Sequence, residues 1–288
     1  MASHLQEQMP LLRRQAQLPW IFRQALLVPE AVALLLILGL YWLTSGAPLI
    51  AFIGLGVIVF FGIRFALLVA ARHALAEARY QQAQRLITVL LRLYPWSADS
   101  LALRGMLLLA TNKADQAEAV LRKALQLFPG QASIHVLLSS TLLELERFIE
   151  ARWEGVQALT LDPSCAIAYL YVAQAEQRLG VPSTDVEQRL REGLALPCDP
   201  ATEGALRCSL ALVLCSLNQD GEARLATAGI ESLLNRCSAL ERASLLYHLG
   251  QLRHAQGEIE QARMLFRTCE QLDPHGRYAA AAWRAARL

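Results

Sequence analysis

The sequence has little excess charge of either sign. Its 288 residues carry a formal net charge of +2, and residues 75–288 hold 22 Lys and Arg against 23 Asp and Glu. Binding to a nucleic acid backbone requires a basic patch or stripe, which this balance does not provide. We therefore expect no nucleic acid partner.

The sequence also lacks the motifs that carry catalysis or metal binding. It has no glycine-rich phosphate loop, no HExxH, no G-x-S-x-G and no EF-hand loop. The six cysteines form no CxxC pair, and we interpret them as free thiols at helix interfaces in a reducing compartment. His248 and His254 are six residues apart, so they lie on different faces of one predicted helix. We expect no enzyme activity, cofactor, metal or small-molecule substrate.

Long apolar runs, by contrast, are present near the N-terminus. Residues 31–44 and 48–63 contain no charge, and three small or polar residues separate them. With their flanks, both runs approach the roughly 20 apolar residues that cross a hydrocarbon core. We expect a transmembrane hairpin over residues 26–68, with helices at about 26–44 and 48–68, after a segment 1–25. The alternative, two buried helices of a soluble core, would require polar faces that these runs lack.

Arginines flank the predicted hairpin on both sides and are absent from its connecting loop: Arg13, Arg14 and Arg23 precede it, and Arg64, Arg72 and Arg79 follow it. The positive-inside rule then places both termini in the cytoplasm, as for a bacterial inner-membrane protein. Glu30 and Arg64 lie at similar predicted depth and are candidates for an ion pair within the membrane. The alternative is two unrelated charges at headgroup level.

No Gly or Pro separates Arg64 from Tyr80. The second apolar run therefore predicts one continuous helix from Pro48 to about Glu77. Such a helix would carry the membrane span directly into the part of the chain that follows.

That following part repeats with a fixed period. Pro95, Pro129, Pro163 and Pro197 are each 34 residues apart, a period typical of stacked helix pairs. Small residues recur where two helices must cross closely: the unit 98–131 has Gly105, Ala117 and Ala124 before its closing Pro129. At these four positions the chain resembles the tetratricopeptide repeat (TPR) family.

The resemblance implies an all-α solenoid of about six helix-turn-helix units and a capping helix. The predicted array covers residues 64–276 and is followed by the cap at 277–288. In this cap, Tyr278, Ala282 and Trp283 are expected to cover the last apolar face while Arg277, Arg284 and Arg287 stay in water. The units have approximate bounds at 64–97, 98–131, 132–165, 166–199, 204–237 and 243–276. After Pro197 the period slips by about four residues, and the edges of the fourth and fifth units are the least regular.

The first helices of such an array line its concave side, which suits an extended segment or a helix of another protein. The repeat register predicts a partner-binding groove formed by Met106, Leu109, Val136, Ser140, Leu143, Leu170, Tyr171, Gln174, Tyr247, His248 and Gln251. Packing of these residues against neighbouring helices is the alternative.

Together, these patterns predict a membrane-anchored, cytoplasm-facing TPR scaffold that binds a peptide or helix of a partner protein in its groove. A second hypothesis keeps the fold and changes the role. In it, the chain is an assembly or regulatory subunit of a membrane complex and is contacted mainly through its hairpin, where Gly54, Gly56 and Gly62 permit close helix approach.

Overall fold

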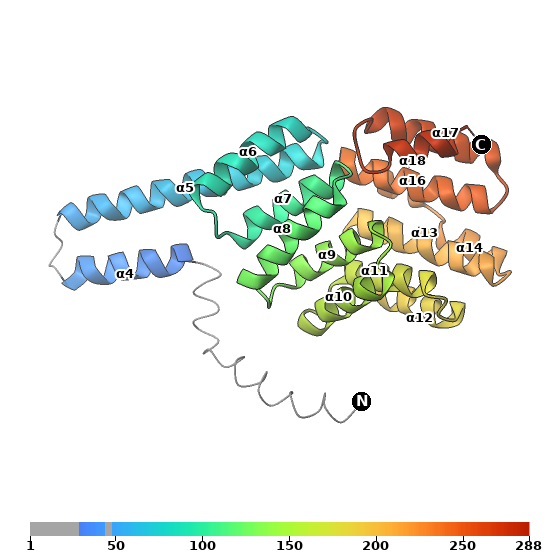
Figure 1. Ribbon diagram of the computed structural model, residues 1–288, viewed down its shortest axis with the longest axis horizontal. Helices are drawn as coiled ribbons and strands as arrows, with labels where there is room; N and C mark the ends of the chain where they lie inside the picture. Colours follow the sequence, from blue (N-terminus) through green and yellow to red (C-terminus); the bar gives the residue numbers. More distant parts are fainter. Residues whose placement is uncertain (1–28, 44–47, 288) are drawn as a thin grey trace, which may run out of the picture. The chain divides into compact units, whose positions relative to one another are not determined.

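The computed structural model describes residues 29–43 and 48–287, and every regular element in these ranges is an α-helix (Figure 1). The predicted all-α class is confirmed. The chain divides into two compact units, and the boundary between them falls within helix α5, between Ala66 and Leu67.

The first unit contains α4 (Pro29–Leu43) and the beginning of α5 (Pro48–Ala76). Helix α5 runs without a break for 29 residues, as the absence of Gly and Pro after Arg64 predicts. Within the described ranges it is the one helix long and apolar enough to cross a membrane. Helix α4 has 15 residues, and the rest of the predicted first span lies outside the described residues, so the two-helix hairpin stays a prediction.

The predicted pair of Glu30 and Arg64 also stays a prediction. The side chain of Glu30 lies outside the described part of the chain. The segment 1–25 lies outside it as well.

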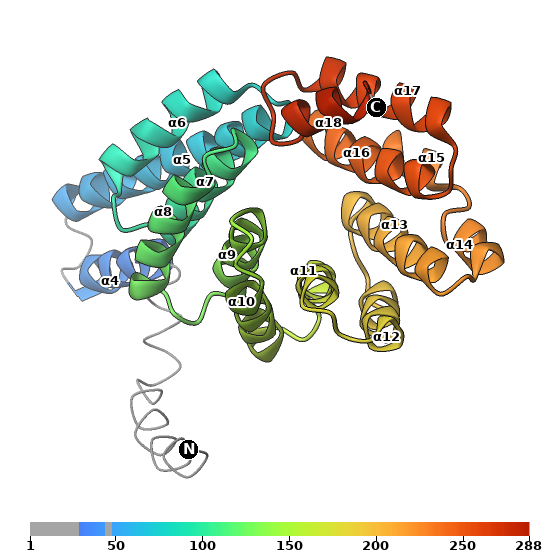
Figure 2. The ribbon, with the colours of Figure 1, turned by 45° about the vertical axis from the view of Figure 1, so that its right-hand side comes forward.

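The second unit is a solenoid of helix pairs. Figure 2 shows the first helix of each pair on the inner side of a curve and the second helix on the outer side. The pairs are α5 with α6 (Tyr80–Leu93), α7 (Ala98–Ala110) with α8 (Ala114–Leu127), α9 (Ala132–Glu144) with α10 (Phe148–Leu161), α11 (Ala166–Arg178) with α12 (Ser183–Leu194), α13 (Pro200–Ser216) with α14 (Asp220–Ala226) and α15 (Ile230–Leu234), and α16 (Ala239–Ala255) with α17 (Ile259–Leu272), before the final α18 (Ala279–Ala285).

One residue in the left-handed region ends the first helix of each pair. These residues have φ between 55° and 79° and are Ala78, Asn112, Glu146, Gly180, Asn218 and Gly257. The left-handed turn lets the next amide reach back to a carbonyl that the helix end leaves unpaired, as Lys113 N does to Leu108 O at 2.8 Å. The first four turns keep the 34-residue period of the prolines. The later two come after longer intervals, consistent with the slip after Pro197.

The fifth pair departs most from the repeat. Its second helix is interrupted at Gly229, which has φ 73° and separates the short α14 from α15. Its first helix, α13, begins at Pro200 with Asp199 as N-cap, whose carboxylate accepts hydrogen bonds from the amides of Ala201 and Thr202. The irregularity therefore lies in the outer helix and leaves the inner one intact.

Small residues set the approach of the two helices within a pair. A Cβ added to Gly105 would lie 2.6 Å from Leu121 Cδ2, and one added to Gly250 would lie 2.6 Å from the ring of Phe266. Ala117 and Ala124 are fully buried in the same kind of contact. Cys208, Cys237 and Cys269 are free thiols buried in these interfaces, and burial raises the pKa of Cys208 to about 12. The interior is thus closely packed and leaves no room for larger side chains at the crossings.

A buried hydrogen-bonded contact between His135 and Glu154 joins the two helices of the third pair. Nδ1 of His135 lies 2.6 Å from Oε2 of Glu154, and its Nε2 lies 3.2 Å from the carbonyl oxygen of Pro129. Burial acts to lower the pKa of His135, but the hydrogen bonds to these two acceptors outweigh it, and the pKa is raised. His135 is therefore a structural residue.

Gly250→Ala should lower the free energy of unfolding by about 1–3 kcal/mol, because the added methyl overpacks a rigid aromatic ring. Thermal unfolding of the full-length chain, followed by circular dichroism, measures this change. Gly221→Ala in α14 is the matched control, since an added Cβ there meets nothing within 4 Å. Equal melting temperatures for Gly250→Ala and the wild type would show that the crossing is not tightly packed.

Candidate functional site

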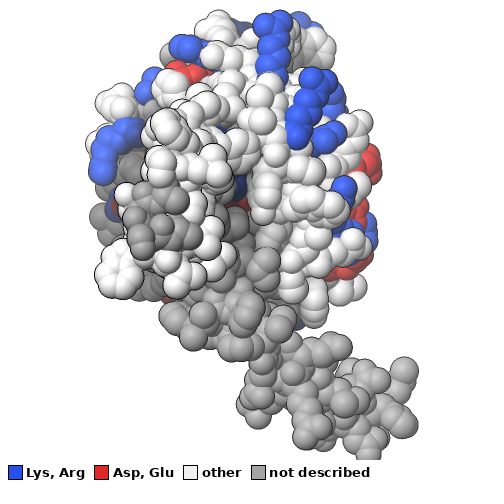
Figure 3. All heavy atoms as spheres, turned by 90° about the vertical axis from the view of Figure 1, so that its left-hand side faces the viewer, with Lys and Arg blue, Asp and Glu red and all other residues white. Residues whose placement is uncertain are grey.

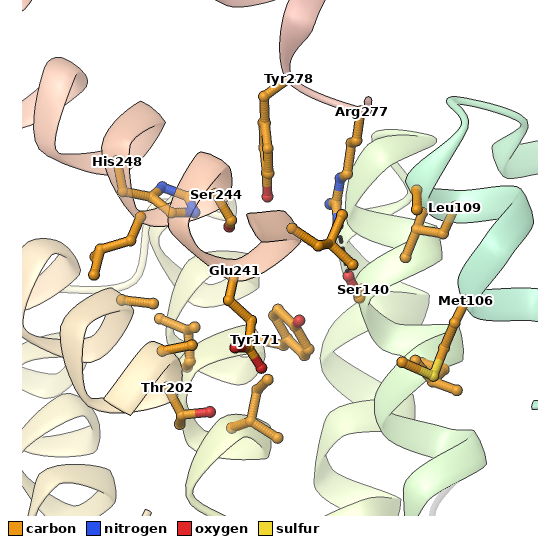
Figure 4. A pocket seen from close by; sticks show the side chains of 18 of the residues that line it. Met106, Leu109, Ser140, Tyr171, Thr202, Glu241, Ser244, His248, Arg277 and Tyr278 are labelled. Carbon is orange, nitrogen blue, oxygen red and sulfur yellow. Dashed lines mark hydrogen bonds between the residues drawn. The ribbon is translucent and has the colours of Figure 1, made fainter. Parts of the chain in front are cut away.

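The inner faces of the solenoid surround a cavity of about 280 Å³. Its walls come from the first helices of five pairs and from the loop between α17 and α18 (Figure 4). The lining residues are Met106, Leu109, Ala110, Leu137, Ser140, Ile167, Leu170, Tyr171, Gln174, Asp199, Ala201, Thr202, Ala205, Leu240, Glu241, Ser244, Leu245, His248, Asp273, Arg277 and Tyr278.

Seven of the eleven residues predicted for the groove line this cavity: Met106, Leu109, Ser140, Leu170, Tyr171, Gln174 and His248. The other four do not. Val136 is 6% exposed and packs with Ala158 and Ala168, and Leu143 packs against the core of the second and third pairs. Tyr247 packs on the cluster around Phe266, and Gln251 is exposed outside the cavity.

The loop from Asp273 to Tyr278, called here the C-terminal loop, reaches across the solenoid to α9. Nη1 of Arg277 donates to Ser140 Oγ at 3.2 Å, and Nε donates to Glu144 Oε1 at 2.7 Å. Nη2 of Arg277 donates to the same carboxylate oxygen. The side chain of Arg277 is only 15% exposed, so the prediction that Arg277 stays in water is wrong. The reason is the curvature of the array, which brings its last loop against its third pair.

A second contact joins the C-terminal loop to the first pair. The hydroxyl of Tyr80 at the start of α6 donates to Oδ2 of Asp273 at 2.5 Å. Burial is the main cause that raises the pKa of both groups. Leu240 of α16 packs nearby against the apolar cluster formed by α5, α6 and α7. The last pair of the solenoid therefore contacts the first, and the curve of the solenoid is closed into a ring.

Tyr278 anchors the C-terminal loop to its own repeat. Its ring stacks on Tyr247 with centroids 4.7 Å apart, and its centroid is 5.6 Å from that of His248. The guanidinium carbon of Arg277 lies 5.2 Å from the Tyr278 ring centroid. The anchor on α16 thus holds Arg277 in place for its contact with α9.

Titratable groups inside the cavity are mostly neutral or acidic. Burial, with the nearby Arg277, lowers the pKa of His248 to about 4, and burial raises the pKa of Tyr171. Three carboxylates line the walls: Asp199 caps α13, Glu241 caps α16 through Ser238, and Asp273 accepts from Tyr80. At neutral pH the one cation among the lining residues is Arg277. The walls otherwise combine aliphatic side chains with hydroxyl groups.

This arrangement suits the binding of a side chain or short segment. No group of three or more His, Cys, Asp or Glu in the described ranges is arranged to hold a metal ion. Sequence reasoning missed Arg277, Glu144 and Tyr278 as neighbours of the groove. The Arg277–Glu144 contact joins residues 133 positions apart, and a repeat period of 34 carries no information about such a contact.

Comparison with known proteins defines the repeats. Residues 98–131 and 243–275 match the family model of the tetratricopeptide repeat, and they coincide with α7–α8 and α16–α17. No curated protein matches the chain. The chain therefore contains tetratricopeptide repeats arranged as an α-solenoid.

Two solved structures are similar in fold. One is PilF of Pseudomonas aeruginosa, with 17% identity over 77% of this chain and 97% of that chain and a TM-score of 0.52. The other is a chain of the APC/C hetero-tetramer Cut9-Hcn1, with 17% identity over 76% of this chain and 41% of that chain and a TM-score of 0.56. At this level of identity the similarity establishes the solenoid fold alone.

His248 makes folding sensitive to acid. Its pKa is lower in the folded protein than the usual 6.5, so the unfolded chain binds its proton more readily, and stability falls as pH drops from 6.5 towards 4. At pH 5.0 the wild type should lose about 1–2 kcal/mol more, relative to pH 7.5, than His248→Gln does. Urea unfolding of both full-length proteins at the two pH values measures this difference.

His135→Gln is the control with the opposite sign. The raised pKa of His135 gives a contribution that is fully present below pH 6.5 and is lost as pH rises through the folded-state pKa. This variant should therefore lose more stability on acidification than the wild type. An identical acid response of His248→Gln and the wild type would contradict the burial of a neutral His248.

Proposed function

We propose that this chain is a membrane-anchored TPR scaffold that binds a segment of a partner protein in its concave cavity and acts by binding, not by catalysis. The observation that carries this proposal is the convergence of the first helices of successive repeats on one cavity. Residues from α7, α9, α11, α13 and α16 all line it. A concave site with apolar walls and a few oriented polar groups is the usual form of a binding site.

The exposed apolar surface of α5 supports the membrane anchor. Leu49, Phe52, Ile53 and Leu55 are all more than half exposed, and the helix carries no charged residue before Arg64. Figure 3 shows a face of the molecule on which uncharged residues predominate. At 1.5 Å per residue, 29 residues extend about 43 Å, longer than the roughly 30 Å of a hydrocarbon core. The helix is thus long enough to span a bilayer and still contribute its last turns to the first repeat.

The arginines around the apolar segments support the orientation. They lie before and after these segments and not between them, which by the positive-inside rule keeps the repeats in the cytoplasm, at a bacterial inner membrane. The partner is then a cytoplasmic protein or the cytoplasmic part of a membrane protein.

The second candidate role is assembly of a membrane complex through the N-terminal helices. An added Cβ on Gly54 would lie 3.1 Å from Ile37 of α4, whereas one on Gly56 or Gly62 meets nothing within 4 Å. Gly54 thus allows α4 and α5 to pack closely against each other. Gly56 and Gly62 leave room for the close approach of another membrane helix.

Site-specific photocrosslinking in intact cells separates the two roles. A benzoylphenylalanine at Met106, which lines the cavity and is 37% exposed, should crosslink one partner strongly. Met264 on α17 is the matched control: it is 69% exposed and outside the cavity, and it should give no such product. A partner crosslinked from Gly56 and not from Met106 would contradict the cavity as the main contact surface and favour the second role.

A further inference from the structure

We infer that the C-terminal loop is an intramolecular latch, and that the partner segment carries an arginine that replaces Arg277 at Glu144 and Ser140. This inference rests on the proposed function, since it names the chemistry of the segment that the cavity binds. It adds a closed state, in which the chain itself occupies the arginine-binding position.

The acceptor for the guanidinium is built entirely by α9. Glu144 lies at the end of that helix, and Ser140 lies one turn earlier, so that both present oxygen atoms to the same side. Arg277 reaches them from the opposite end of the solenoid. Figure 4 shows its side chain extending from the C-terminal loop towards Ser140. The acceptor therefore exists independently of the loop that fills it.

Charge favours a basic occupant. The cavity walls carry Asp199, Glu241 and Asp273, and Glu144 lies at their edge, while Arg277 is their one cation at neutral pH. When the C-terminal loop leaves, Asp273 moves with it, and the carboxylates of Asp199, Glu241 and Glu144 remain at the cavity and its rim with no Lys or Arg among the lining residues. Arginine suits such a site because its planar guanidinium donates to several acceptors at once.

The contacts that hold the latch permit an arginine of the partner segment to replace Arg277. Glu144 keeps 33% of its side chain exposed, so solvent weakens its pairing with Arg277 and a partner can approach the carboxylate from outside. Between the first and the last pair, the hydroxyl of Tyr80 makes one hydrogen bond to Asp273, and Leu240 adds apolar packing. Met106 and Leu109 lie on the neighbouring helix α7, on the same side of the cavity as Ser140 (Figure 4), and offer an apolar surface to the residues next to the incoming arginine.

A peptide supplied in trans tests the inference on the full-length protein. The probe is a fluorescent peptide with the sequence of residues 272–283, and its control replaces the arginine by glutamine. Fluorescence anisotropy should show binding to Arg277→Ala at least tenfold tighter than to the wild type, whose own loop competes. The control peptide should bind Arg277→Ala at least tenfold more weakly than the arginine peptide.

Two further variants complete the test. Adding Glu144→Gln to Arg277→Ala should abolish the preference for the arginine peptide. Arg284→Ala, which removes a nearby exposed arginine outside the cavity, should bind like the wild type. Melting temperatures of all variants establish that each is folded, and Arg277→Gln replaces Arg277→Ala if the latter is not.

Equal binding to wild type and Arg277→Ala, no binding to a folded Arg277→Ala or Arg277→Gln protein, or an unchanged preference after Glu144→Gln would each overturn the latch. Failure of the proposed function has a different signature, the absence of any partner crosslinked from Met106 in both wild type and Arg277→Ala. A partner crosslinked equally well in both would leave the cavity as a binding site without a latch.

Discussion

The structure depends on one constraint: a single pair of helices cannot bury both of its apolar faces, so each pair must be covered by the next. The close approach that this requires is made by small residues such as Gly155 and Gly204. A Cβ added to Gly155 would lie 2.6 Å from Val172 of the next pair, and one added to Gly204 would lie 2.7 Å from Leu245 of the next pair. Repeating the same crossing bends the stack and gathers the first helices on its inner side. Two ends then remain to be covered. At one end α5 serves as the first helix of the array, and at the other α18 packs on α16 and α17 through Tyr278 and Ala282.

Closure of the curve converts an open groove into a cavity. The contacts Arg277–Glu144 and Tyr80–Asp273 join repeats that are far apart in the chain, and both come from the short C-terminal loop. A solenoid of this kind need not be permanently open to its ligand. Its own terminal loop occupies the acceptor on α9, and the acidic walls behind it favour a basic segment. In the proposed function, binding therefore depends on a few side chains placed on a general scaffold.

Much of this fold follows from local sequence signals. The period of the prolines predicts the turns, and four left-handed residues from Ala78 to Gly180 repeat that period in the backbone. The uninterrupted stretch after Arg64 predicts the continuous α5.

The residues of the groove are predicted less completely than the helices. Register alone directs Val136 and Tyr247 inward, but neighbouring helices bury the first and Tyr278 covers the second. The sequence wrongly predicts an exposed Arg277, because the position of this residue depends on the curvature summed over four pairs. No local pattern encodes that curvature.

The most direct test of the account is the distance between α6 and the C-terminal loop in the full-length protein. Spin labels can be introduced as unnatural amino acids at Gln81 and His275, which are both exposed, so that the native cysteines are not labelled. Pulsed electron paramagnetic resonance then measures the distance between the two labels. The account predicts one short, narrow distance distribution in the wild type and a longer, broader one in Arg277→Ala. A long distance in the wild type, or identical distributions in both proteins, would contradict a concave side closed by the chain itself.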